Sequence, residues 1–111
     1  ALDPNLVDAW VRKGITLLDM DELNQASKCL NEAVRLSPRS FKALYNRGKL
    51  RQQNHDYEEA LSALLRAAAV KPQNPTVHDR IGDLLVVLGK PNLAEKYKAK
   101  AEKIRKKKKT D

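Results

Sequence analysis

Apolar residues recur along this chain at intervals of three and four, and short polar segments interrupt them. This spacing places the apolar side chains on one face of an α-helix. Polar or backbone-permissive sequences suited to turns lie near Asp21, near His55 and at Gly89, and prolines separate the remaining segments. The pattern predicts six helices, near residues 7–20, 24–36, 41–54, 58–70, 75–88 and 92–108.

The segments form a repeat with a period of 34 residues. Such a period is typical of solenoids, in which each unit buries its apolar face by stacking on its neighbours. The repeated glycines lie in mid-helix, where glycine costs about 1 kcal/mol relative to alanine, so we expect them to permit close helix packing. The residues in register are Pro4, Pro38 and Pro72; Gly14, Gly48 and Gly82; Ala26, Ala60 and Ala94; and Ala33, Ala67 and Ala101.

These positions resemble the tetratricopeptide repeat, and the likeness covers nearly the whole chain. The first repeat matches the family pattern at Trp10, Gly14, Leu17, Ala26, Leu30, Ala33 and Pro38; the second at Leu44, Gly48, Tyr57, Ala60, Leu64, Ala67 and Pro72; and the third at Ile81, Gly82, Leu85, Ala94, Tyr97 and Ala101. The resemblance implies an all-α, right-handed solenoid of three helix-turn-helix repeats. We assign residues 1–6 to the end of a preceding repeat, 7–40, 41–74 and 75–105 to repeats one to three, and 106–111 to a basic tail.

The pattern decays toward the C-terminus, where Lys98 stands in the place of Leu30 and Leu64, and Lys106 in the place of the expected proline. A terminal solenoid helix needs a polar outer face, so we expect the last helix to be an extended basic cap. Leu2 to Asn5 matches the last turn of the other repeats, and we expect the parent protein to continue upstream.

The resemblance also implies a concave groove, lined by the first helix of each repeat, that takes a peptide or an amphipathic helix of another protein. Asp8, Asp19, Gln53 and Asp79 share this face with the candidate residues, and its four positive and four negative charges are expected to cancel. An open alternative is that the apolar members are buried between helices. The candidate groove residues are Val11, Arg12, Ile15, Lys42, Tyr45, Asn46, Lys49, Thr76, Arg80, Asp83 and Val87.

A co-chaperone role is the alternative within the same family. Its best-known variant holds acidic chaperone tails in a carboxylate clamp, and only Asn46 and Arg80 match that clamp here. The other clamp positions carry Val11, Ile15 and Thr76, none of which donates a charged hydrogen bond. The sequence therefore disfavours a clamp.

Most of the +8 net charge belongs to the C-terminal end, since residues 91–111 hold nine Lys and Arg against three Asp and Glu. This cluster resembles a nuclear-localisation or polyanion-binding segment, so nucleic acid and acidic lipid are weaker candidate partners. The alternative is a solvated helix end whose cations suit the helix dipole. The basic cluster consists of Lys103, Arg105, Lys106, Lys107, Lys108 and Lys109.

No residue pattern indicates catalysis, a cofactor or a metal site. Cys29 is the only cysteine and lies at an inward phase, which predicts a buried thiol, and Trp10 is likewise expected in the core. His55 is placed in a turn, and His78 stands at the phase of Trp10 and Leu44, away from metal-ligand spacing. No apolar run is long enough to span a bilayer. We expect a protein that is not an enzyme and that lies in the cytoplasm, with the nucleus as the alternative location because of the lysine-rich end.

Overall fold

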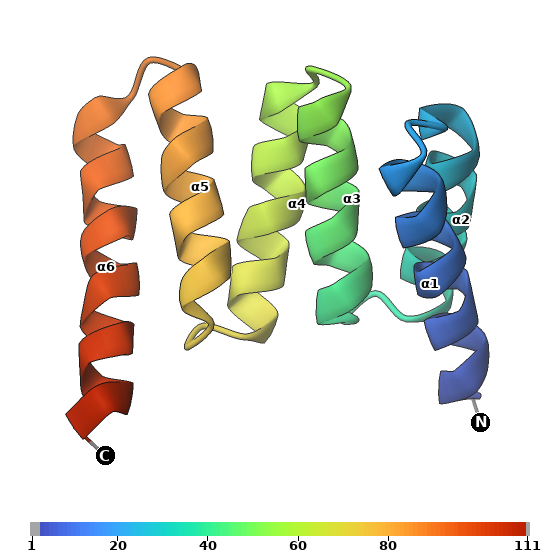
Figure 1. Cartoon of the computed structure of the whole chain (residues 1–111), viewed down its shortest axis with the longest axis horizontal. Helices are drawn as coiled ribbons and strands as arrows, with labels where there is room; N and C mark the ends of the chain where they lie inside the picture. Colours follow the sequence, from blue (N-terminus) through green and yellow to red (C-terminus); the bar gives the residue numbers. More distant parts are fainter. Residues whose placement is uncertain (1–2, 111) are drawn as a thin grey trace.

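The computed structural model describes residues 3–110, and the side chains up to Lys109. These residues form six α-helices and no strand, in the order that the sequence predicts (Figure 1). The all-α fold of three two-helix repeats is therefore confirmed. The helices are α1 (Pro4–Asp19), α2 (Leu23–Leu36), α3 (Phe41–Gln53), α4 (Tyr57–Val70), α5 (Pro75–Val87) and α6 (Pro91–Thr110).

The first helix begins three residues earlier than the periodicity predicts. Asp3 adopts an extended backbone and its carboxylate accepts a hydrogen bond from the Asn5 amide at 2.9 Å, while Pro4 occupies the first helical turn. This is the usual chemistry of a helix start, in which proline loses no needed donor. Residues 4–6 thus belong to α1, and the assignment of residues 1–6 to a preceding repeat stays a prediction.

Each repeat turns between its two helices in the same way. Asp21, His55 and Gly89 have positive φ angles of 60°, 64° and 77°. The amide of the following residue closes each turn on a carbonyl five positions back, as in the 2.8 Å bond from Asp56 N to Arg51 O. Such left-handed C-terminal turns reverse the chain while satisfying the last helical carbonyls.

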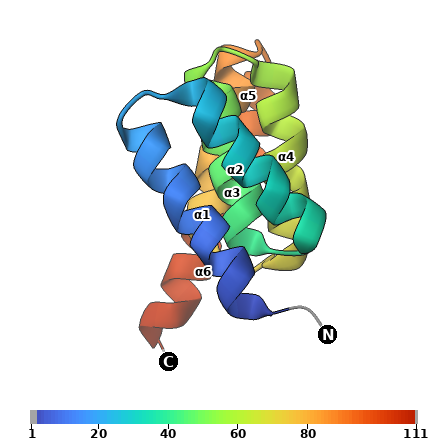
Figure 2. The same cartoon turned by 90° about the vertical axis from the view of Figure 1, so that its right-hand side faces the viewer.

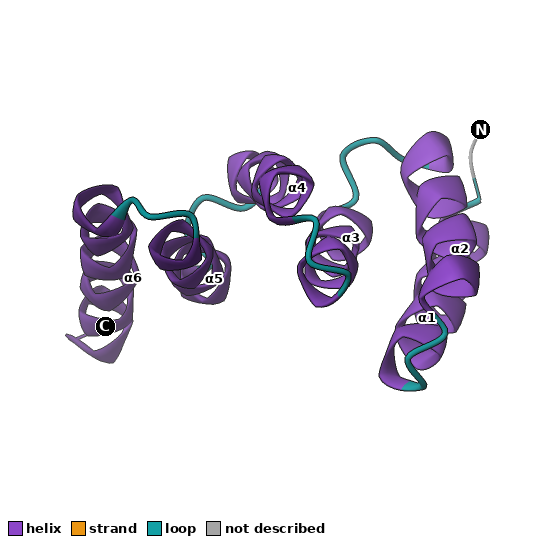
Figure 3. Cartoon of the chain, turned by 90° about the horizontal axis from the view of Figure 1, so that it is seen from above, coloured by secondary structure: helices purple, strands orange, loops and turns teal. Residues whose placement is uncertain are grey.

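The two helices of each repeat pack together, and the second helix of one repeat also packs on the first helix of the next. The repeats therefore form a row rather than a closed bundle (Figure 1). Seen from above, α3 and α5 lie on one side of α4 (Figure 3). Figure 2 looks along the row from the end formed by α1 and α2.

Small residues hold the paired helices close together, as the recurring glycines and alanines predict. A Cβ atom on Gly14 or Gly48 would come within 2.8 Å of Leu30 or 2.7 Å of Leu64 at Cγ. Cys29 is buried, as predicted. Trp10 packs against the core, as predicted, but remains partly exposed at its edge.

Candidate binding groove

The first helices of the repeats, α1, α3 and α5, carry the predicted groove residues, but the structure divides these residues by exposure. Val11 is 2% exposed and Asn46 is 8% exposed, so these two are buried between helices, as the alternative reading of the pattern allowed. Ile15, Tyr45, Lys49 and Arg80 are partly buried, and Arg12, Lys42, Thr76, Asp83 and Val87 are exposed.

Tyr45 is the centre of a cluster that links α3 to α5. Arg80 Nε donates a hydrogen bond of 3.0 Å to the Tyr45 hydroxyl, and its guanidinium carbon lies 5.5 Å from the centre of the ring. Lys49 Nζ lies 6.0 Å from the same ring, and Phe41 stacks on it at 5.6 Å between centroids. Cations over an aromatic face attract its quadrupole, so the two helices hold a preformed cationic and aromatic surface.

The charge of Arg80 is held by neutral groups. Besides Tyr45, its guanidinium donates to the Gln52 side-chain oxygen at 3.3 Å. Within residues 3–110, no carboxylate lies at ion-pair distance from Arg80, Lys42 or Lys49. All three cations therefore keep their charge available to a ligand.

Three of the four acidic side chains on this face are engaged by cations. Arg12 pairs with Asp8 on α1 at 2.8 Å. Two cations of α6 reach back to acids of α5, where Arg105 pairs with Asp79 and Lys98 pairs with Asp83. The eight charges of this face are thus not all paired with one another, because α6 supplies the cations that pair with Asp79 and Asp83. The middle of the groove is left positive.

A hollow of about 380 Å³ lies between the start of α1 and the start of α3. Val7 and Val11 line it together with Asp8 on one helix and Lys42 on the other. Val11 is thus buried among its neighbours and still contributes to an apolar floor. An apolar side chain of a ligand fits such a recess better than a charged one does.

Asn46 does not present its amide to the groove. Its Nδ2 donates a hydrogen bond of 2.8 Å to the Lys42 carbonyl within α3. With Val11 buried and Thr76 and Ile15 uncharged, Arg80 remains the one clamp position with a charged donor among those described. The geometry thus agrees with the sequence in disfavouring a carboxylate clamp.

The residues of the basic cluster at the end of α6 differ in their exposure. Arg105 is partly buried, and its pKa is raised above the ordinary value because it donates to Asp79. It therefore serves the contact between α5 and α6 rather than an open cationic surface. Lys103, Lys106, Lys107, Lys108 and Lys109 are exposed.

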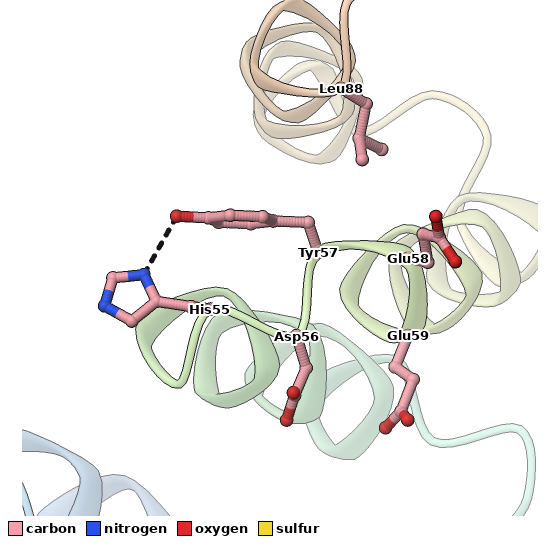
Figure 4. A pocket seen from close by; sticks show the side chains of 6 residues that line it. All are labelled: His55, Asp56, Tyr57, Glu58, Glu59 and Leu88. Atoms are coloured by element: carbon pink, nitrogen blue, oxygen red, sulfur yellow. Dashed lines mark hydrogen bonds between the residues drawn. The ribbon is translucent and has the colours of Figure 1, made fainter.

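The turn between α3 and α4 borders a further hollow, of about 330 Å³ (Figure 4). Its lining includes the carboxylates of Asp56, Glu58 and Glu59, and His55 Nδ1 is hydrogen-bonded to the Tyr57 hydroxyl at 2.9 Å. In residues 3–110, no group of three or more His, Cys, Asp or Glu side chains is placed to hold a metal ion.

His78 is buried in the third repeat. Its Nε2 donates a hydrogen bond of 2.7 Å to the Pro72 carbonyl, and the centre of its ring lies 6.1 Å from the centre of the Tyr97 ring. Nδ1 has no hydrogen-bond partner in the described part of the chain. His78 thus occupies a core position, as its phase with Leu44 suggests.

Sequence reasoning missed the residues that connect one helix to another. Phe41 and Gln52 support the Tyr45 cluster, and Arg105 and Lys98 neutralise acids of α5. A signal existed for Lys98, because a lysine in the place of a core leucine needs a carboxylate within reach.

The comparisons with known proteins agree with this architecture. The model of the tetratricopeptide repeat family matches residues 11–75 and 45–105. Human tetratricopeptide repeat protein 7A is 31% identical over 91 residues, which cover 82% of this chain and 11% of that protein. The chain thus spans about a tenth of the length of this curated relative.

Two solved structures show the same fold. A crystal structure of MamA superposes with a TM-score of 0.92 at 24% identity, covering 99% of this chain and 64% of that one. The Yersinia enterocolitica type III secretion translocator chaperone SycD superposes with a TM-score of 0.86 at 15% identity, covering 92% and 77%. At these identities the likeness establishes the fold alone.

None of the helices in the described residues has both the length and the apolar character needed to cross a bilayer. The repeat architecture is that of a scaffold for protein–protein interaction, a class that is generally non-enzymatic. On the match of the family model to most of its length, this chain belongs to the tetratricopeptide repeat family.

Proposed function

We propose that the groove of this chain holds a segment of a partner protein, as an extended peptide or an amphipathic helix, that carries both acidic and apolar side chains. The observation that carries the proposal is the cluster around Tyr45. There Arg80 and Lys49 flank one aromatic ring, and no carboxylate of the described chain neutralises either cation. Acidic side chains of a ligand complement such a surface.

The hollow over Val7 and Val11 supports the apolar half of the proposal. It lies beside Lys42, on the same helix that carries Tyr45, so one ligand segment spans both features. Aromatic and arginine side chains surrounded by a polar rim are typical of residues that dominate binding energy. We expect Tyr45 and Arg80 to contribute most, Arg12 and Thr76 to form the polar rim, and the exposed Val87 to add an apolar contact beside it.

Site-specific photocrosslinking in cells tests this proposal. A benzoylphenylalanine at Lys42 or Thr76 should give a discrete adduct with a partner protein, because both side chains are exposed on the groove helices. The same group at Lys28 of α2 or Lys96 of α6 is the matched control, since these positions are exposed on the second helices. Arg80→Glu in the Lys42 variant should abolish the adduct through charge repulsion.

Adducts of equal yield from the control positions, or an adduct that survives Arg80→Glu in a folded variant, would refute the groove proposal. Circular dichroism of each variant verifies the fold. The co-chaperone role, the contact of the lysine-rich end with nucleic acid or acidic lipid, and the cytoplasmic location stay predictions.

A further inference from the structure

A second polar recess lies between α3 and α4. It has a volume of about 230 Å³ and is lined by Arg47, Arg51, Glu59, Ser62, Ala63 and Arg66. Because each helical residue advances by about 100°, Arg47 and Arg51 lie on the side of α3 away from Lys42 and Tyr45. The recess is thus separate from the groove.

The second repeat departs from the repeat pattern at one position of this recess. Arg51 stands at the phase of Leu17 and Leu85, whereas Arg47 is in phase with Lys13 of the first repeat and Ile81 of the third. Ile81 is fully buried and Leu85 is 2% exposed. An arginine where the other two repeats have a leucine costs packing and solvation, and the fold alone gives no reason for Arg51.

The three arginines outnumber the acids that face them. Arg51 has only long contacts, 3.7 Å to Asp56 and 3.5 Å to Glu59. Arg47 and Arg66 form no ion pair in the part of the chain that the structure describes. The pKa of Arg47 is lowered mainly by burial and further by the positive charges of Arg51 and Arg66, while Glu59 opposes the shift.

From this geometry we propose that the recess between α3 and α4 binds a phosphorylated side chain of a partner protein. Arg47 and Arg66 offer two planar guanidinium groups, each able to donate two parallel hydrogen bonds to phosphate oxygens. A phosphorylated side chain carries close to two negative charges, which match two unpaired arginines better than one carboxylate does.

The adjoining surface favours a peptide over a bilayer as the source of the phosphate. A neighbouring hollow of about 270 Å³ shares Arg66 and adds Arg39, Leu44 and Val70. A phosphorylated residue in the recess therefore has room beside it for a flanking apolar or acidic side chain. The acidic residues Glu58 and Glu59 line the neighbouring hollow of Figure 4 and would repel an anionic membrane.

The experiment compares the full chain with a variant that carries the third repeat's residues at the recess. Arg47→Ile with Arg51→Leu introduces the residues that stand at these two phases in the third repeat, so this variant should fold, and circular dichroism verifies the fold. The control, Lys28→Gln with Lys100→Gln, removes the same charge from exposed positions. Binding is measured on a degenerate phosphoserine peptide array, its unphosphorylated twin, a twin with glutamate, and vesicles of phosphatidylcholine and phosphatidylserine.

We expect a subset of phosphoserine peptides to bind the native chain and the control, and to lose about tenfold or more in affinity with the Arg47→Ile, Arg51→Leu variant. Inorganic phosphate should compete. The proposal is overturned if no phosphoserine peptide binds, if the unphosphorylated or glutamate peptides bind equally, if both variants lose equally, or if only the vesicles bind. Arg80→Glu should leave this binding unchanged, which separates it from the groove.

Discussion

Lys98 of α6 lies directly against Gly82 of α5: a Cβ atom on this glycine would come within 3.0 Å of both Cγ and Cε of the lysine. At the same phase in the second repeat, Gly48 faces Leu64, and the corresponding distance to Cδ2 is 2.6 Å. Lysine has an unbranched, flexible stem, whereas leucine is branched and enclosed. The third repeat thus keeps the glycine without the rigid partner that requires it.

Alanine substitutions should therefore have different effects at the two glycines. Gly48→Ala should lower the free energy of unfolding by about 1 kcal/mol, because overpacking against Leu64 exceeds the gain in helix propensity. Gly82→Ala should be neutral or stabilising by up to about 1 kcal/mol, since the Lys98 stem moves aside. Urea unfolding followed by circular dichroism measures both. Equal losses in the two variants would contradict this account.

A second prediction concerns the turns within repeats. His55 has a left-handed backbone conformation at the position where the third repeat has Gly89. His55→Gly should raise the unfolding free energy by about 0.5–1 kcal/mol, because glycine adopts this conformation without a steric penalty. Gly89→Ala should lower it by about 1 kcal/mol, although a Cβ there has open space around it.

Thermal unfolding of these two variants is the measurement, and His55→Ala is the matched control. That substitution removes the same contact to Tyr57 but keeps a Cβ atom, so it should give no stabilisation. If His55→Ala stabilises as much as His55→Gly, backbone strain is not the cause.

The fold was predictable from the sequence because the repeated residues determine the backbone geometry. The groove was less predictable, because the contacts of individual side chains determine which of its residues are exposed or paired. Gly14, Gly48 and Gly82 identified the paired helices at once. The start of α1 was predicted three residues too late because of Pro4. This proline is in phase with Pro38 and Pro72, which lie between helices, but it begins a helix after the Asp3 cap. The pairing of Asp83 with Lys98 depends on how far a long side chain reaches, which a periodic pattern does not specify.

A third prediction concerns acid stability. The pKa of Glu32 is lowered below its ordinary 4.5 because Arg35 donates hydrogen bonds to its carboxylate at the surface of α2. A depressed pKa gives stability that is present above the unfolded pKa and lost as the pH falls through the folded one. The stability difference between the native chain and Glu32→Gln should thus be constant above pH 4.5 and shrink below it.

Urea unfolding across a pH series measures this difference, with Arg35→Gln as the reference background. In the Arg35→Gln background, the stability difference between glutamate and glutamine at position 32 should no longer depend on pH in the acid range. A dependence of the same size in both backgrounds would show that another carboxylate is responsible.

The last prediction concerns the contact between Tyr45 and Arg80. This hydrogen bond joins the second repeat to the third, and it pairs a charged side chain with an aromatic one. A double-mutant cycle with Tyr45→Phe and Arg80→Gln should show a coupling of about 1 kcal/mol in the unfolding free energy. The exposed pair of Arg12 and Asp8 is the control, and its coupling should be at most about 0.5 kcal/mol. A coupling at Tyr45 no larger than at this control would mean that the cluster is not preformed, and the ligand would then have to order it on binding.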